Sequence, residues 1–204
     1  MECFCRMKDA DKIKTETFVW SGPFAWSGYE NETGLDSIPD VEGVYLWTFE
    51  YEDGYLLYLA GVTKSMKTRF QSHSRTFKNG GYTVLDMGAA QKGIRIEIWH
   101  GWPSKENEKE CKEAFNADTV NLEKLKNQLY SMRVFILESS DKRLRERMEA
   151  ALMHSLVYSK ESWADLADRG MALNGVRYNS EMPIIAKNII ENKDVKKIYG
   201  LFDE

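Results

Sequence analysis

The sequence predicts an α/β domain with a small central, mostly antiparallel β-sheet flanked by helices. Two observations predict this class. Two apolar, aromatic-rich runs, Gly43 to Phe49 and Tyr55 to Val62, lie on either side of Asp53-Gly54, a dipeptide typical of tight hairpin turns. After Gly61 the spacing of apolar residues changes from a period of two to about 3.6, which indicates that the hairpin leads into a helix.

Composition narrows the class of protein. The 204 residues are 43% hydrophobic and 12% aromatic, which is typical of a globular chain. The formal net charge of −4 argues against a broad nucleic-acid-binding surface, which is usually basic. A local cluster of basic residues nevertheless follows the hairpin, and on charge alone a solvated helix face explains it equally well. Its members are Lys64, Lys67, Arg69, Arg75 and Lys78.

Cysteine usage and hydropathy predict the compartment. The three cysteines, Cys3, Cys5 and Cys111, lack the spacing of a disulfide framework or a four-ligand zinc site, so free thiols are expected. The first residues lack the apolar segment of a signal peptide, and we find no apolar run long enough to span a bilayer. We therefore expect a cytoplasmic protein without membrane attachment.

The first 40 residues are expected to form an N-terminal extension that packs on the core. Phe18-Val19-Trp20 is compatible with a short strand. The mixture of aromatic residues and glycines from Trp20 to Tyr29 predicts a turn-rich loop that covers the core. A stacking platform for nucleic-acid bases is the alternative interpretation of the same aromatic residues.

The domain proper is expected to run from residue 41 to 180. Lys64 to His73 predicts a helix with Met66 and Phe70 on its buried side, ended by Asn79-Gly80-Gly81. Alternation in Ile94 to Trp99 then predicts a half-buried strand.

The second half of the domain contains an expected insertion. Residues 103 to 130 are charged and helical in pattern, with a break near Asn116-Ala117-Asp118. Met132 to Leu137 predicts a strand, and Asp141 begins the strongest helix, which continues to about Tyr158. Residues 181 to 204 are expected to carry a short helix around Ile184 to Ile190 and a charged tail.

The order of these motifs resembles the GIY-YIG nuclease family. Gly43-Val44-Tyr45 stands for the first family motif, and Gly61 stands for the glycine of the second. Arg69 follows Gly61 by eight residues, which is the family spacing to its helix arginine. His73 falls where several restriction-type members carry a histidine, one helical turn from Arg69.

The second tyrosine motif departs from the family pattern. The family tyrosine would stand at the position of Leu59, whereas the nearest tyrosine is Tyr58, one residue earlier. An offset of one residue on a regular strand turns a side chain to the opposite face. Three outcomes follow: a β-bulge near Ala60 brings Tyr58 back to the site, Tyr45 acts alone, or catalysis is lost.

The family also places a metal-binding glutamate on a helix that follows a strand. By this resemblance Glu149 is the candidate metal ligand, and Glu146, one turn earlier, is its competitor. Asn174 matches the asparagine that supports the family site, with Asn179 as a second candidate. Lys64 lies near a loop lysine seen in some members.

The resemblance implies a metal-dependent endonuclease that hydrolyses phosphodiester bonds in DNA, with RNA as an alternative substrate. Tyr45 would take the proton of the attacking water or relay it, within reach of Lys64 or His73. Arg69 and Lys64 would bind the scissile phosphate, and Glu149 would hold Mg²⁺ or Mn²⁺. A homodimer is compatible with this family. The alternative, motivated by Leu59 and the acidic net charge, is a catalytically degenerate module that binds nucleic acid or another protein.

Overall fold

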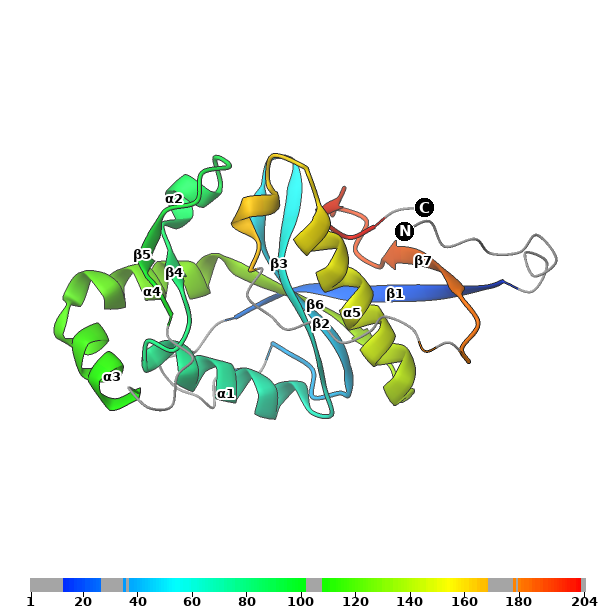
Figure 1. Cartoon of the computed structure of the whole chain (residues 1–204), viewed down its shortest axis with the longest axis horizontal. Coiled ribbons are helices and arrows are strands. Elements are labelled where there is room, and N and C mark those ends of the chain that lie inside the picture. Colours follow the sequence, from blue (N-terminus) through cyan, green and yellow to red (C-terminus); the bar gives the residue numbers. More distant parts are fainter. Residues whose placement is uncertain are drawn as a thin grey trace.

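The computed structural model describes residues 13–26, 35, 37–101, 108–168, 178 and 180–202. Within these residues one six-stranded sheet forms the centre of the molecule (Figure 1). Its strands follow the order β7-β1-β6-β2-β3-β8. They are β1 (Lys14–Ala25), β2 (Gly43–Tyr51), β3 (Gly54–Thr63), β6 (Met132–Glu138), β7 (Ile184–Ile190) and β8 (Ile198–Tyr199).

The remaining described elements surround this sheet. A small two-stranded sheet and the helices α2 to α4 lie together at one end of the molecule, and α1 runs along one long side (Figure 1). Helix α5 crosses in front of the central strands. Their bounds are α1 (Met66–Lys78), β4 (Val84–Leu85), α2 (Met87–Ala90), β5 (Glu97–Trp99), α3 (Glu108–Ala117), α4 (Thr119–Ser131), α5 (Lys142–Tyr158) and a 3₁₀ turn (Ala164–Leu166).

The sheet corrects the predicted architecture. The centre is antiparallel, because β2 pairs with both β3 and β6 and β6 pairs with β1. The two outer pairs, β1 with β7 and β3 with β8, are parallel. The α/β class is therefore confirmed, but the sheet is mixed and larger than the small, mostly antiparallel sheet that was predicted.

Two segments outside the central hairpin differ from the prediction. The short strand expected at Phe18-Val19-Trp20 is confirmed as part of the 12-residue β1. The turn-rich loop expected from Trp20 is wrong as far as Ala25, because β1 continues to that residue inside the sheet. The expected helix at Ile184–Ile190 is the strand β7. Its four isoleucines are β-branched and favour extended backbone. Parallel pairing with β1 supplies the partner that makes the strand stable.

The hairpin forms as predicted, but its turn lies one residue earlier. Gly54 pairs with Tyr51 as the first residue of β3, so the turn consists of Glu52 and Asp53. The positive φ that was assigned to Asp53-Gly54 falls on Glu52, at 49°. Gly54 has a different role, since a β-carbon there would collide with the backbone of Lys197. The glycine lets the C-terminal segment approach the hairpin closely.

The helices predicted within residues 41 to 180 are confirmed, and the caps of α1 and α5 are visible. The Ser65 side chain accepts a hydrogen bond from the Thr68 amide at the start of α1, and Asp141 accepts one from Leu144 at the start of α5. Asp118 separates α3 from α4, where the break was expected. The strand expected from Ile94 is shorter, because β5 begins at Glu97 and Ile94 is 54% exposed.

Helix α5 is attached to the sheet at a charged contact and at the edge of β3. Arg145 is buried and donates to the Glu42 carboxylate and to the Ser139 carbonyl, both at 2.6 Å. Further along, the Ala60 amide of β3 donates to the Met153 sulfur at 3.2 Å. Side chains of α5 thus satisfy backbone donors that a further strand would otherwise bind.

None of the helices in the described part of the chain is both long and apolar enough for a membrane crossing.

Candidate active site

The Tyr45 side chain lies on the sheet face that α1 covers. Tyr45 and Gly61 are cross-strand partners in the β2–β3 hairpin, so they point to the same face. A β-carbon at position 61 would collide with the phenol oxygen and lie 2.9 Å from ring carbon Cε2 of Tyr45. The glycine therefore provides the space that the tyrosine ring occupies. The ring is almost completely buried, at 1% exposure.

Two side chains of α1 converge on the phenol oxygen of Tyr45. Arg69 Nε donates to this oxygen at 3.2 Å, and His73 Nε2 lies 3.0 Å from it. Arg69 and His73 are four residues apart, so the helix presents them on one face in successive turns. Met66 and Phe70, both fully buried, fix that face against the sheet, as predicted.

Burial sets the protonation states of Tyr45 and His73. Removal from water raises the pKa of Tyr45 to about 12, although the Arg69 charge acts in the opposite direction. Burial, aided by the Arg69 charge, lowers the pKa of His73 to about 3. Aromatic rings surround the imidazole, and Trp47 is perpendicular to it with centroids 4.5 Å apart. At neutral pH the site therefore contains a neutral phenol, a neutral imidazole and one guanidinium.

Glu149 approaches the same group from α5. Its carboxylate accepts a hydrogen bond from the Val62 backbone amide, next to Gly61 on β3. Burial raises the pKa of Glu149, while the Val62 hydrogen bond and the Arg69 charge act in the opposite direction. The charge of Glu149 also influences Tyr45 and Arg69. The structure thus brings together four sequence-predicted site residues from β2, α1 and α5.

The competing carboxylate, Glu146, is engaged elsewhere. Its oxygens lie 3.6 Å from the Lys142 amine and 3.5 Å from the Arg143 guanidinium, and both partners are on the same helix. Glu146 therefore belongs to the charged surface of α5. The preference for Glu149 as the residue nearer to Tyr45 and Arg69 agrees with this geometry.

Tyr82 is a member of the group that the sequence analysis did not identify. Its hydroxyl lies 2.9 Å from His73 Nδ1, on the side of the imidazole opposite Tyr45. Burial raises the pKa of Tyr82, and Arg69 lowers it. Tyr82 follows Gly80-Gly81, where the chain turns after α1. The double glycine is a signal for a sharp return of the chain toward the helix, but it does not specify His73 as the contact.

Tyr58 sits at a β-bulge, though not at the position expected. The register of the hairpin shifts where Trp47 pairs with Leu59 and Thr48 pairs with Leu57, so Tyr58 is the extra residue. Leu59 shares the strand face of Gly61 and is buried. The charged groups that act on the Tyr58 phenol are Asp168, Arg95 and Glu97, and burial raises its pKa. The structure thus places Tyr58 in a different electrostatic environment from Tyr45.

For the other predicted site residues we describe no contact with the Tyr45 hydroxyl. Gly43 is the first residue of β2, and a β-carbon there would collide with the backbone of Leu137 in β6. Lys64 is an exposed residue in the turn between β3 and α1. Asn174 and its alternative Asn179 lie outside the described residues.

The donor chemistry of the site fits a hard divalent cation. Mg²⁺ keeps several waters and commonly binds one or two carboxylates together with substrate phosphate oxygens. Glu149 supplies one partly buried carboxylate beside a phosphate-binding type of side chain, Arg69. Among the described residues no cluster of three or more His, Cys, Asp or Glu side chains could form an all-protein metal cage. Glu149 is the carboxylate of the group around Tyr45 that could bind such an ion.

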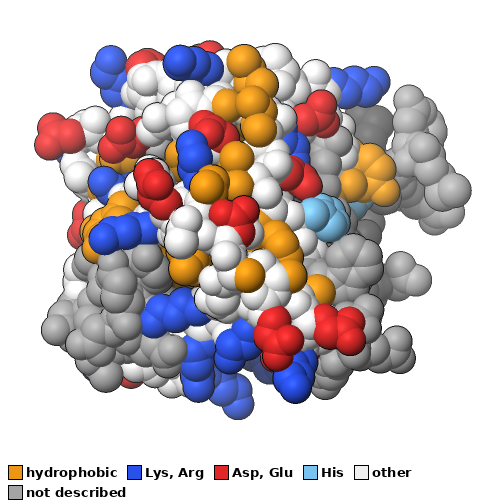
Figure 2. Space-filling model, turned by 90° about the vertical axis from the view of Figure 1, so that its left-hand side faces the viewer, with side chains coloured by type: hydrophobic (Ala, Val, Ile, Leu, Met, Phe, Trp, Pro, Cys, Tyr) orange, Lys and Arg blue, Asp and Glu red, His pale blue; other side chains and the backbone are white. Residues whose placement is uncertain are grey.

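Basic side chains gather beside this site. Figure 2 shows Lys and Arg side chains along the lower edge of one end of the molecule, at the level where α1 lies in Figure 1. Helix α1 contributes the exposed residues Lys67, Arg69 and Arg75. The rest of this face mixes acidic, basic and hydrophobic side chains (Figure 2). Helix α1 thus carries positive charge beside the candidate site, although the net charge of the chain is −4.

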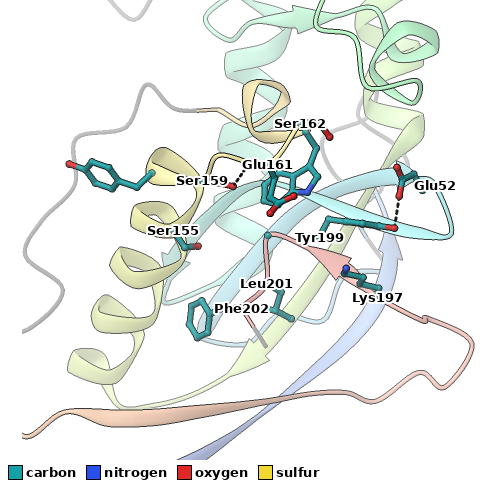
Figure 3. A pocket seen from close by; sticks show the side chains of 12 residues that line it. Glu52, Ser155, Ser159, Glu161, Ser162, Lys197, Tyr199, Leu201 and Phe202 are labelled. Atoms are coloured by element: carbon teal, nitrogen blue, oxygen red, sulfur yellow. Dashed lines mark hydrogen bonds between the residues drawn. The ribbon is translucent and has the colours of Figure 1, made fainter. Parts of the chain in front are cut away.

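A cavity of about 550 Å³ lies at a different place in the fold (Figure 3). Its walls come from the end of α5, the segment that follows it and the C-terminal segment. Several of its polar groups already bind each other. The Tyr199 hydroxyl donates to Glu52 at 2.7 Å, and the Glu161 amide donates to the Ser159 hydroxyl at 3.2 Å. The side chains of Arg69, His73 and Glu149 gather around Tyr45 instead. We therefore take these four residues, the Tyr45 group, as the candidate active site.

Comparison of the chain with protein-family models, curated proteins and solved structures gave no match.

Proposed function

We propose that the protein is a metal-dependent endonuclease of the GIY-YIG type that hydrolyses phosphodiester bonds in DNA. One observation carries the proposal. Arg69 and His73 converge on the phenol oxygen of Tyr45, within 3.2 Å, and the carboxylate of Glu149 interacts with the same arginine. These four residues occupy the positions that the family motif implies.

The group supports a proton relay. An attacking water forms the new bond to phosphorus, and the bond from phosphorus to the 3′ oxygen breaks. Tyr45 retains its proton at neutral pH because its pKa is raised to about 12. The phenol oxygen therefore accepts the water proton while its own proton moves to His73 Nε2, 3.0 Å away. A bound phosphate adds negative charge, which favours protonation of the imidazole.

Arg69 and Glu149 complete the proposed chemistry. The Arg69 guanidinium provides positive charge for the phosphate next to the nucleophile relay. Glu149 would hold a Mg²⁺ or Mn²⁺ ion, which, when bound, supplies positive charge to the leaving 3′ oxygen. The basic residues of α1 offer further phosphate contacts and give binding a dependence on salt concentration.

A plasmid-nicking assay tests this proposal. We expect conversion of supercoiled plasmid to nicked circles in Mg²⁺, none in EDTA, and none with Glu149→Gln. Glu146→Gln is the matched control, since it changes a carboxylate three residues away on the same helix and should cut normally. Cutting that is unaffected by Glu149→Gln, or no metal-dependent cutting of DNA or RNA substrates, contradicts the proposal.

A second candidate function is a catalytically silent nucleic-acid-binding module. The specific observation behind it is Leu59, which occupies the strand face where the family pattern has its second tyrosine. This candidate predicts binding of DNA that weakens with salt and does not require a divalent ion. A gel-shift titration in EDTA at several salt concentrations measures this directly. Binding without cutting supports the silent module, and absence of binding at low salt leaves a role in protein interaction.

A further inference from the structure

The imidazole of His73 lies between two tyrosine hydroxyls. Its Nε2 is 3.0 Å from the Tyr45 oxygen, and its Nδ1 is 2.9 Å from the Tyr82 oxygen. The histidine is 3% exposed. A neutral imidazole carries one ring proton, so one nitrogen donates and the other accepts. Which nitrogen is protonated decides whether His73 can take a proton from Tyr45.

The hydrogen bonds of Tyr45 distinguish the two tautomers. Arg69 can only donate, so its Nε–H occupies one acceptor position of the phenol oxygen. If His73 Nε2 also carried a proton, it would donate to the same oxygen, and the buried Tyr45 proton would need a third partner. If Nε2 is bare, Tyr45 donates to it and all three groups are satisfied. A buried hydroxyl proton without an acceptor is costly, so the second arrangement is favoured.

The contact of Tyr82 completes this arrangement. With Nε2 bare, His73 Nδ1–H donates to the Tyr82 oxygen, 2.9 Å away. Tyr82 is partly exposed, so its own hydroxyl proton can donate to water. The donors then run in one direction, from Tyr45 to His73 and from His73 to Tyr82.

We infer that Tyr82 is a positioning residue that holds His73 in the Nδ1-protonated tautomer, so that the bare Nε2 faces the Tyr45 hydroxyl. Tyr82 thus acts through His73 and makes Nε2 the acceptor for the Tyr45 proton. The tautomer follows from the hydrogen bonds alone. Its consequence for catalysis rests on the proposed nuclease function, where Tyr45 passes a proton to His73 as it takes one from water.

The first test is nitrogen-15 NMR of the imidazole in the uniformly labelled full chain. The chain has three histidines, and the signals of His73 are those lost in His73→Gln. Couplings to the ring carbon-bound protons show which nitrogen is protonated. We expect wild-type His73 to be neutral at pH 7 with Nδ1 protonated. Protonation at Nε2 in the wild-type protein overturns the inference without any variant or activity measurement.

Tyr82→Phe tests the role of the hydroxyl. We expect the variant to show a mixture of the two His73 tautomers, because Nδ1 loses its acceptor. Tyr130→Phe removes a hydroxyl from a tyrosine that is 46% exposed, and should leave the tautomer unchanged. An unaltered Nδ1-protonated imidazole in Tyr82→Phe contradicts the assignment of Tyr82 as the residue that fixes it.

The nicking assay separates this inference from the proposed function. If the wild-type protein cuts DNA, Tyr82→Phe should lower kcat with little change in KM, by roughly tenfold or more, since loss of a general base costs about 10²–10⁴-fold. An unchanged kcat overturns the catalytic part of the inference. If the wild-type protein does not cut, the nuclease proposal fails, while the NMR result still decides the tautomer.

Discussion

The ring of Tyr45 lies over the bare α-carbon of Gly61, its cross-strand partner in the β2–β3 hairpin. Glycine in a strand usually weakens the sheet, and its presence often marks a close approach of other atoms. Here the approaching atoms belong to the aromatic ring that receives the hydrogen bonds of Arg69 and His73. Gly61 therefore has a steric role at the centre of the candidate site.

Gly61→Ala should displace Tyr45, because the added methyl group would occupy the space of the phenol ring. We expect a loss of about 1–3 kcal/mol in the free energy of unfolding, which is typical of overpacking a core. Urea denaturation measures this loss. Gly88→Ala is the control, since a β-carbon there would lie 3.4 Å from an Asp86 oxygen, within ordinary contact. Equal stability of Gly61→Ala and the wild-type protein contradicts the steric role.

Tyr45→Phe and Tyr58→Phe should have different effects on cleavage. Tyr45 holds the oxygen on which Arg69 and His73 converge, so its loss should reduce kcat by about 10²–10⁴-fold. Tyr58 lies among the charges of Asp168, Arg95 and Glu97, and its variant should cut at nearly the wild-type rate. Single-turnover nicking rates of the two variants decide this. A comparable loss in Tyr58→Phe shows that both hydroxyls act in the reaction.

His73 should make folding stability depend on pH in a defined direction. Its pKa is about 3 in the folded protein, below its ordinary value of 6.5, so the unfolded chain binds the extra proton first. The stability contribution is complete above pH 6.5 and is lost as the pH falls toward 3. Between pH 7 and 4.5 the wild-type protein should lose roughly 2–3 kcal/mol more than His73→Gln does.

Urea denaturation of both proteins at the two pH values measures this difference. His154→Gln is the control, because it removes an exposed histidine from α5. Parallel pH profiles of the wild-type protein and His73→Gln would show that His73 is protonated normally in the folded state.

The contact between Arg145 and Glu42 should contribute strongly to stability. Arg145 is 5% exposed and binds the Glu42 carboxylate at 2.6 Å, so Glu42→Ala leaves a buried cation without its counter-ion. The Glu42 side chain is 38% exposed and Arg145 keeps its bond to the Ser139 carbonyl, so water can partly replace the lost carboxylate. We expect a loss of about 1–3 kcal/mol. Lys142→Ala breaks an exposed pair with Glu146 and should cost less than about 1 kcal/mol. Thermal or urea unfolding compares the two variants, and similar losses in both contradict the prediction.

Local signals in the sequence predicted the elements that hold most of the candidate site. The hairpin, α1, β6 and α5 follow from alternation, helical periodicity and capping residues, all of which are properties of short segments. The pairing of Tyr45 with Gly61 and the common face of Arg69 and His73 follow from these elements. Glu149 was preferred only because of the family resemblance, and its hydrogen bond to Val62 depends on how α5 meets the edge of β3.

Features that depend on distant segments were predicted incorrectly or not at all. Isoleucine-rich Ile184–Ile190 becomes a strand because β1 lies beside it, and its sequence alone does not identify that partner. The bulge at Tyr58 is set by pairing with β2, and a single-residue shift leaves little trace in a uniformly apolar strand. Tyr82 belongs to a turn after α1, and only the folded chain shows that its hydroxyl meets His73.

The position of β1 has a consequence for how the protein is made. Both neighbours of this strand come much later in the chain, as shown by the contacts of Ser21 with Ile136 and of Trp20 with Asn188, 115 and 168 residues apart. During synthesis β1 therefore leaves the ribosome long before β6 and β7 exist. Its backbone donors and acceptors must stay hydrated, or be shielded by chaperones, until those strands arrive. A strand that is translated before both of its neighbours is thus incorporated late, and the sheet is complete only after β7 and β8 have been translated.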